Sequence, residues 1–135
     1  MDVEQYIFGI MVAERSEKDL KNLERELTFV VQGPIDLKHT PRCIESIKRH
    51  FKKSRIILTT WDSEKDKVNN LPEIDFIFNE DPGAACDDLN GIKRDNINRQ
   101  IVSSSAGLKI AKSKYVIKTR TDIFFKNNNI LKYYK

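Results

Sequence analysis

Residues 27–34 read Leu-Thr-Phe-Val-Val-Gln-Gly-Pro, and this stretch decides the fold. Its first five residues are rich in β-branched and aromatic side chains, and the run stops at Gly33-Pro34, a pair that breaks regular structure. So short an apolar run predicts a buried β-strand, because strands covered on both faces are apolar at nearly every position. The sequence on either side should therefore supply more strands and the helices that cover a sheet.

Three other segments repeat this near-continuous apolar character and predict strands: 55–61 (Arg-Ile-Ile-Leu-Thr-Thr-Trp), 73–78 (Glu-Ile-Asp-Phe-Ile-Phe) and 115–119 (Tyr-Val-Ile-Lys-Thr). Apolar residues at helical spacing lie between them, and we expect one helix after Thr40 and another from Ile97 to about residue 112. Strands that alternate with helices predict an α/β fold, with a mostly parallel Rossmann-like sheet and helices on both faces.

Short-range signals place the ends of these elements. Thr40 and Pro41 have the character of an N-cap and a first helical residue. Ser16 and Asp19 have capping-box spacing and open a charged helix. We interpret that helix as lying on its own domain, with a partner-binding helix as the alternative. Residues 79–96 are rich in turn formers and predict a loop over the sheet edge.

Bulk composition bounds the remaining possibilities. The 135 residues suit one domain, and 39% hydrophobic residues suffice for a packed core. The net charge is +4, and the densest group of cations, residues 48–53, is expected at a helix C-terminus, so nucleic acid is not expected as a partner. Cys43 and Cys86 lack metal or redox spacing, which favours a reduced, cytoplasmic chain.

The apolar run from Tyr6 to Ala13 is too short to span a membrane, and acidic residues precede it. We expect ordinary packing for this segment. Docking on a membrane or on a partner remains an alternative.

The carboxyl ends of the predicted strands carry polar residues, and ligands of open α/β sheets bind at those ends. Amide, carboxylate and guanidinium groups would meet there at one rim, a combination suited to a nucleotide diphosphate. The four strand ends read Gln32-Gly33-Pro34, Trp61-Asp62, Asn79-Glu80-Asp81 and Arg120-Thr121-Asp122.

Each group at this rim has a possible use. Gly33 lets backbone approach a ligand closely, and Asp62 can accept hydrogen bonds from a base or a ribose. Arg99 and Arg120 can neutralise phosphate oxygens. Asp122 can hold magnesium or manganese together with phosphates and water. Taken singly, the same residues also fit ordinary turn formers.

Three further segments have two interpretations each. Residues 96–101 (Asn-Ile-Asn-Arg-Gln-Ile) open a helix where anions bind, or they form a solvent-facing first turn. Asp87 and Asp88 form a carboxylate pair, but neighbouring side chains in a loop usually diverge. The serines at 103–105 have no His-and-acid frame around them and are interpreted as small residues for close helix packing.

Two glycine-rich motifs are missing from the sequence. There is no Gly-x-Gly-x-x-Gly after the first strand and no Gly-x-x-x-x-Gly-Lys-Ser/Thr. Their absence argues against a dinucleotide-dependent dehydrogenase and a P-loop nucleotidase. Sugar transfer and methyl transfer remain.

Seven blocks, in this order, resemble the WavE lipopolysaccharide-synthesis glycosyltransferases over residues 28–125. They are Val-Val-Gln-Gly-Pro-Ile (30–35), Thr40, Ile-Ile-Leu-Thr-Thr-Trp (56–61), Asn-Glu-Asp-Pro-Gly (79–83), Asn-Ile-Asn-Arg-Gln-Ile (96–101), Gly-Leu-Lys (107–109) and Tyr-Val-Ile-Lys-Thr-Arg-Thr-Asp (115–122).

This resemblance implies a GT-A-like nucleotide-sugar-binding domain at 28–125, after an N-terminal segment and helix (1–27) and before a tail (126–135). It also implies a divalent cation, manganese or magnesium, at Asp122. Arg120 replaces the first aspartate of the GT-A Asp-x-Asp motif, so a guanidinium could take over part of the diphosphate charge. The implied donor-binding residues are Gln32, Gly33, Pro34, Asp62, Asn98, Arg99, Gln100, Arg120 and Asp122.

Members of the family need a further stretch after this motif, for acceptor contacts and for the general base of inverting enzymes. No catalytic residue is therefore assigned, and we expect little transferase activity from these 135 residues alone. The expected function is the donor-binding part of a glycosyltransferase in lipopolysaccharide or capsule assembly, with a saccharide or lipid-linked saccharide acceptor. The expected location is the cytoplasm, including the inner face of the membrane.

Two rivals remain open at this point. One is a nucleotide-binding or regulatory module without chemistry, derived from such a transferase. The other is a methyltransferase-like domain, against which the lack of a glycine-rich first loop argues.

Overall fold

Strand β3 (Leu27–Gln32) runs inside a four-stranded sheet, and all six of its residues are buried. The computed structural model describes residues 6–7, 10–11, 16–86 and 94–132. The sheet order is β5-β4-β3-β8, with β4 (Arg55–Trp61), β5 (Asp75–Asn79) and β8 (Tyr115–Arg120). All three pairings are parallel, which confirms the predicted α/β fold.

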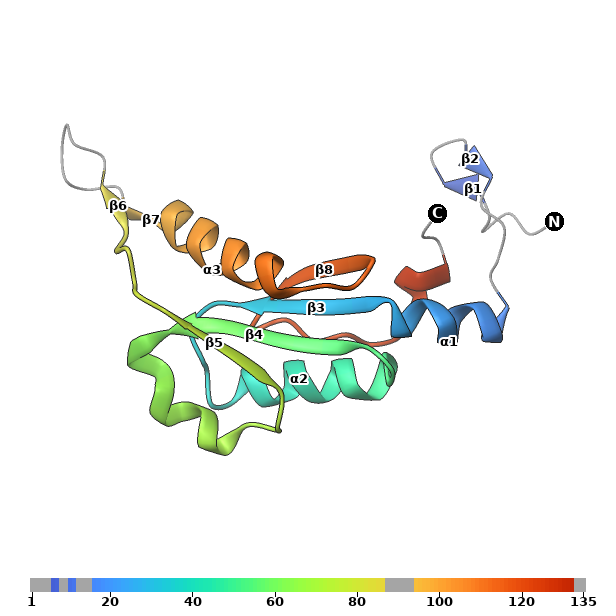
Figure 1. Cartoon of the computed structure of the whole chain (residues 1–135), viewed down its shortest axis with the longest axis horizontal. Helices are drawn as coiled ribbons and strands as arrows, with labels where there is room; N and C mark the ends of the chain where they lie inside the picture. Colours follow the sequence, from blue (N-terminus) through green and yellow to red (C-terminus); the bar gives the residue numbers. More distant parts are fainter. Residues whose placement is uncertain (1–5, 8–9, 12–15, 87–93, 133–135) are drawn as a thin grey trace.

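Helices cover both faces of this sheet, as Figure 1 shows. On one face, α2 (His39–His50) packs Ile44 and Ile47 into a core cluster with Phe29 and Val31 of β3. On the other face, α3 (Ile97–Ile110) contacts β3, β4 and β5. Successive residues of a strand point to opposite faces, so β3 contributes to both layers.

Smaller elements flank the sheet. Helix α1 (Glu17–Arg25) precedes β3, and the Ser16 hydroxyl accepts a hydrogen bond from the Asp19 amide, which confirms the predicted cap. The 3₁₀-helices are η2 (Asp62–Asn70) and η3 (Asn129–Lys132). Two antiparallel pairs join β1 (Tyr6–Ile7) to β2 (Ile10–Met11) and β6 (Ala85–Cys86) to β7 (Arg94–Asp95). None of the described helices is long and apolar enough to cross a membrane.

The predicted cap of α2 is wrong. Thr40 lies inside the first turn, and its hydroxyl accepts a hydrogen bond from the Asp36 amide at 2.9 Å. The carboxylate of Asp36 accepts the amide protons of Lys38 and His39, both at 2.8 Å. Asp36 therefore satisfies the first amides of the helix, the role that we assigned to Thr40.

Element ends also differ by one or two residues from those expected. Strands β3 and β8 each run one residue further, to Gln32 and Arg120, and α3 ends at Ile110. The predicted loop at 79–96 contains the β6–β7 pair. Asp87 and Asp88 lie outside the described residues.

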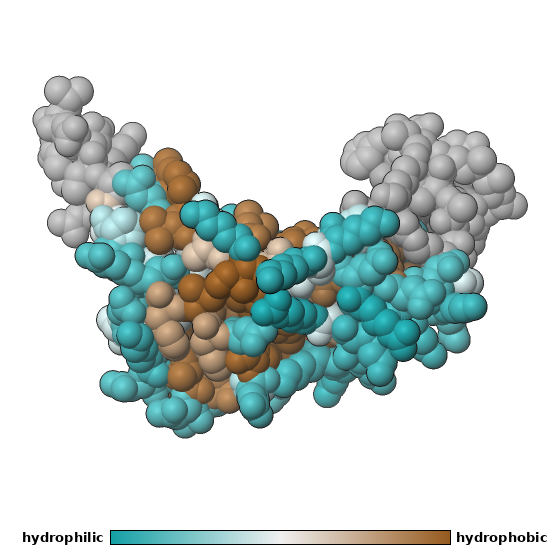
Figure 2. All heavy atoms as spheres, in the orientation of Figure 1, coloured by the Kyte–Doolittle hydropathy of each residue, from teal (hydrophilic) through white to brown (hydrophobic). Residues whose placement is uncertain are grey.

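The face of α3 toward the sheet consists of small residues. Ser103 and Ser104 are buried, as the interpretation of close helix packing requires, and so is Gly107. The larger apolar side chains that predicted this helix are about half exposed, and Figure 2 shows hydrophobic surface over α3. They are Ile97, Ile101 and Leu108.

Gly107 lets α3 lie against β3 and β4. A Cβ atom placed there would overlap Cγ1 of Val30 and would lie 3.4 Å from Cγ2 of Thr59. We expect Gly107→Ala to lower the free energy of unfolding by about 1–2 kcal/mol, because overpacking outweighs the gain in helix propensity. Urea denaturation measures this change.

Lys109→Ala is the matched control, since Lys109 is exposed in the same helix. We expect its effect to stay within about 0.5 kcal/mol. Equal stability of Gly107→Ala and the parent chain would contradict the close packing of α3.

Candidate functional site

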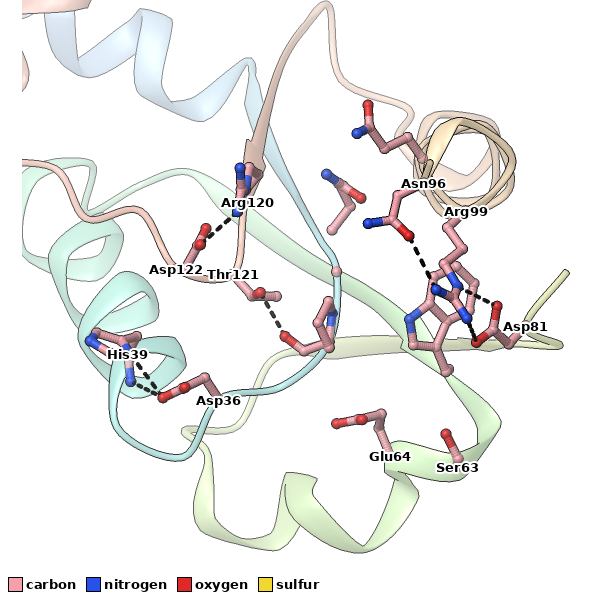
Figure 3. A pocket seen from close by; sticks show the side chains of 15 residues that line it. Asp36, His39, Ser63, Glu64, Asp81, Asn96, Arg99, Arg120, Thr121 and Asp122 are labelled. Carbon is pink, nitrogen blue, oxygen red and sulfur yellow. Dashed lines mark hydrogen bonds and ion pairs between the residues drawn. The ribbon is translucent and has the colours of Figure 1, made fainter. Parts of the chain in front are cut away.

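A hollow of about 720 Å³ opens at the carboxyl ends of β3, β4 and β8 (Figure 3). It lies at the rim where the sequence places the polar strand ends. Its walls come from the loops after these strands, from the start of α2 and from the first turn of α3. The lining residues are Gln32, Gly33, Pro34, Asp36, His39, Trp61, Ser63, Glu64, Asp81, Asn96, Arg99, Gln100, Arg120, Thr121 and Asp122.

Gln32 is held where β3 ends. Its side chain is largely buried, and its Oε1 accepts a hydrogen bond from Ser103 Oγ at 2.9 Å. Ser103 Oγ also lies 2.8 Å from the carbonyl oxygen of Arg99. These contacts fix the first turns of α3 beside the end of β3.

The loops after β3 and β8 are tied together. Gly33 has a φ of +128°, a conformation that side chains disfavour, and its amide donates to the carbonyl oxygen of Thr59 at 3.2 Å. Thr121 Oγ1 donates to the carbonyl oxygen of Pro34 at 2.6 Å, and the Thr121 amide donates to Gln32 O at 3.2 Å. The floor of the hollow is therefore a fixed piece of backbone.

The two guanidinium groups of the hollow each have a carboxylate partner. Arg99 donates to both oxygens of Asp81, at 2.8 and 3.0 Å, and to Asn96 Oδ1 at 3.1 Å. These contacts lower the pKa of the Asp81 carboxyl below its ordinary value and raise the pKa of Arg99. Arg120 donates to Asp122 Oδ2 at 2.7 Å.

The opposite wall holds acceptor groups. Glu64 is mostly buried, accepts from the Ile35 amide at 3.0 Å and pairs with Lys67 at 3.0 Å. Asp36 faces the imidazole of His39 at 3.0 Å, and hydrogen bonds from the backbone amides of His39 and Lys38 are the main cause of its lowered pKa. This wall holds the loop after β3 in place.

Cys43 lies beneath the β8 end, with its Sγ 3.5 Å from the carbonyl oxygen of Arg120. Burial, with a smaller effect from the negative charge of Asp122, raises the pKa of this thiol to about 12. Cys43 is therefore a neutral packing residue.

Seven of the nine residues predicted for the donor site line this hollow, and two do not. Asp62 begins η2 and pairs with Lys65 at 2.9 Å, while Asn98 is exposed in the first turn of α3. The residues at the hollow are Gln32, Gly33, Pro34, Arg99, Gln100, Arg120 and Asp122.

Several lining residues were not predicted. Glu64 lies three positions after the end of β4. Its main-chain partner Ile35 is 29 residues away, so no local sequence pattern predicts that Glu64 lines the site. Asp36 could have been found, since an aspartate shortly before a helix commonly accepts hydrogen bonds from its first backbone amides. Ser63 follows a predicted strand end. Trp61 and Asp81 belong to strand ends that were expected at this rim, but neither was assigned a role in donor binding.

A family model described as WavE lipopolysaccharide synthesis matches residues 27–135. The chain belongs to this family. The resemblance drawn from the sequence blocks is thereby confirmed. No curated protein matches the chain significantly.

A solved structure with the same fold is the crystal structure of residues 1–349 of TarS from S. aureus. The TM-score is 0.50 and the sequence identity is 14%, and the match covers 78% of this WavE-family chain. The chain spans 30% of the TarS structure. At this level of identity the comparison establishes the fold.

The hollow offers few protein ligands for the divalent cation that the family resemblance implies. Within the described residues, no three His, Cys, Asp or Glu side chains are grouped so that they could hold a metal ion. Asp122 supplies one carboxylate, which Arg120 already holds. A cation here would fit only with phosphate oxygens and water as its other ligands.

The Arg99–Asp81 pair predicts a measurable pKa effect in the WavE-family chain. The pKa of Asp81 is lowered in the folded chain, so the pair stabilises the folded loop fully at pH values above the ordinary pKa of 3.8. This stabilisation is lost as the pH falls through the lower pKa of the folded state. In Arg99→Gln the pKa of Asp81 should rise toward 3.8. A carboxyl NMR titration over the acid range measures it.

Arg55→Gln is the control for this titration. It breaks the 2.7 Å pair of Arg55 with Asp75 at the other end of the sheet. An Asp81 titration that is the same in the parent chain and in Arg99→Gln would contradict the pair.

Proposed function

We propose that this chain is the nucleotide-sugar donor-binding part of a glycosyltransferase that acts in lipopolysaccharide or other cell-surface polysaccharide synthesis. Membership in the WavE family supports the process. One structural observation carries the proposal: Arg99 and Arg120, from α3 and β8, line one hollow at the carboxyl end of a parallel sheet. Ligands of such sheets bind at this end.

The hollow suits a nucleotide sugar in size and chemistry. Its volume of about 720 Å³ lies in the range of small-molecule sites. Guanidinium groups bind phosphate oxygens through paired, charge-assisted hydrogen bonds. The diphosphate would therefore lie between Arg99 and Arg120.

The nucleoside would lie toward the β4 end of the hollow. Trp61 lines this end, although its side chain is mostly buried. Pro34 and Ser63 border the same space, and the Glu64 carboxylate lies nearby. An apolar surface with a few acceptors is suited to a base and its ribose.

The reaction would be displacement at the anomeric carbon of the donor sugar, as in GT-A enzymes. Negative charge grows on the departing diphosphate, and preorganised cations stabilise it. Arg120 and Arg99 would supply this stabilisation from the protein. The divalent cation at Asp122 remains a prediction. The general base, which is expected in a further stretch of the family's chain, also remains a prediction.

Isothermal titration with UDP, GDP, CDP and ADP, each with and without manganese, tests the proposal. We expect one nucleoside diphosphate to bind with micromolar affinity, and Arg99→Gln or Arg120→Gln to weaken it about tenfold or more, the usual loss for a charged hydrogen bond. Metal-dependent binding that is lost in Asp122→Ala supports an enzyme site, whereas metal-independent binding supports a binding module.

Arg49→Gln is the control, because it removes an exposed guanidinium at the far end of α2. Failure of all four nucleotides to bind under every condition would falsify the proposed donor site. Equal weakening by Arg49→Gln would show that binding reflects net charge alone.

A further inference from the structure

The ion pair of Arg120 with Asp122 lies at the mouth of the proposed diphosphate subsite. The two side chains meet through one 2.7 Å contact, between Arg120 Nη2 and Asp122 Oδ2. Both are well exposed, at 64% and 45% of the side-chain surface. Arg99, by contrast, is held by both oxygens of Asp81.

The lining of the hollow has more carboxylates than guanidinium groups. Four acids face two arginines, and each arginine is paired with one of these acids. A diphosphate brings further negative charge to this lining. Because both arginines are already paired, a diphosphate that binds either of them has to displace its carboxylate or enter with a cation that neutralises that carboxylate. The four acids are Asp36, Glu64, Asp81 and Asp122.

We propose that Asp122 is an internal competitor of the diphosphate for Arg120, and that a divalent cation and the diphosphate bind cooperatively by exchanging the partners of this pair. The inference rests on the proposed function of the hollow. The cation takes the Asp122 carboxylate, and the freed Arg120 guanidinium takes phosphate oxygens. Each event removes the competitor of the other, which is the thermodynamic condition for positive coupling.

The surrounding backbone allows this exchange without a change of fold. Thr121 lies between the two residues and is fixed by its hydroxyl to Pro34 O and by its amide to Gln32 O. Only the exposed side chains need to turn. Exposed ion pairs contribute little to stability, so opening this pair is easy, whereas the two-bonded Arg99–Asp81 pair is the harder one to open.

Asp122→Asn tests the competition, because it removes the charge and keeps the shape. With inorganic pyrophosphate as the probe in calorimetry, we expect the parent chain to bind about tenfold more tightly when manganese is present. In Asp122→Asn, metal-free pyrophosphate should bind about tenfold more tightly than in the parent chain, and manganese should add nothing. Asp75→Asn is the matched control, since Asp75 forms a 2.7 Å exposed pair with Arg55 at the opposite end of the sheet.

Arg120→Gln tests the other half of the exchange. In calorimetry, manganese should tighten pyrophosphate binding to this variant less than it does in the parent chain, because Asp122 has no internal partner left to exchange. Weaker pyrophosphate binding with an unchanged effect of manganese would contradict the exchange.

Two failures can be told apart. If nucleoside diphosphates bind the parent chain equally with and without manganese, and Asp122→Asn changes nothing, the competitor is refuted while the donor site stands. If neither pyrophosphate nor any nucleoside diphosphate binds the parent chain or Asp122→Asn, the proposed function falls together with the inference.

Discussion

The burial of β3 between two parallel neighbours is the constraint on which the rest of the structure depends. Hydrogen bonding to β4 on one side and β8 on the other sets Gln32 opposite both Thr59 and Arg120. A register shift of one residue would turn the core residues of β3 toward the wrong helix. The same register brings the ends of three strands to one rim, so core packing and site assembly are a single requirement.

Much of this arrangement is readable from the sequence because it is local. Strands buried on both faces can be predicted from continuous apolar runs, and both ends of β4 are predicted to the residue. The α3 helix is also predicted, but not its orientation. Its apolar side chains point outward, while serines and Gly107 face the sheet because the helix lies close to it. A hydropathy pattern gives no information on this distance between helix and sheet.

The site is less readable than the fold because its contacts join distant parts of the chain. Their positions at strand ends correctly place Gln32 and Arg120 at the hollow. The same reasoning fails for Asp62, which pairs with Lys65 and does not line the hollow. The partners of the arginines also differ in kind. Asp122 is two residues from Arg120 and could be guessed, whereas Asp81 reaches Arg99 across 18 positions and a loop.

The small residues on the inner face of α3 have a consequence for the hollow itself. They set how low the helix lies over the sheet, and the first turn of the same helix carries Arg99. A bulkier residue at position 107 would change the tilt of the helix relative to the sheet, and with it the height of the Arg99 guanidinium above the floor. The depth of the hollow is therefore set from a position that never touches its contents.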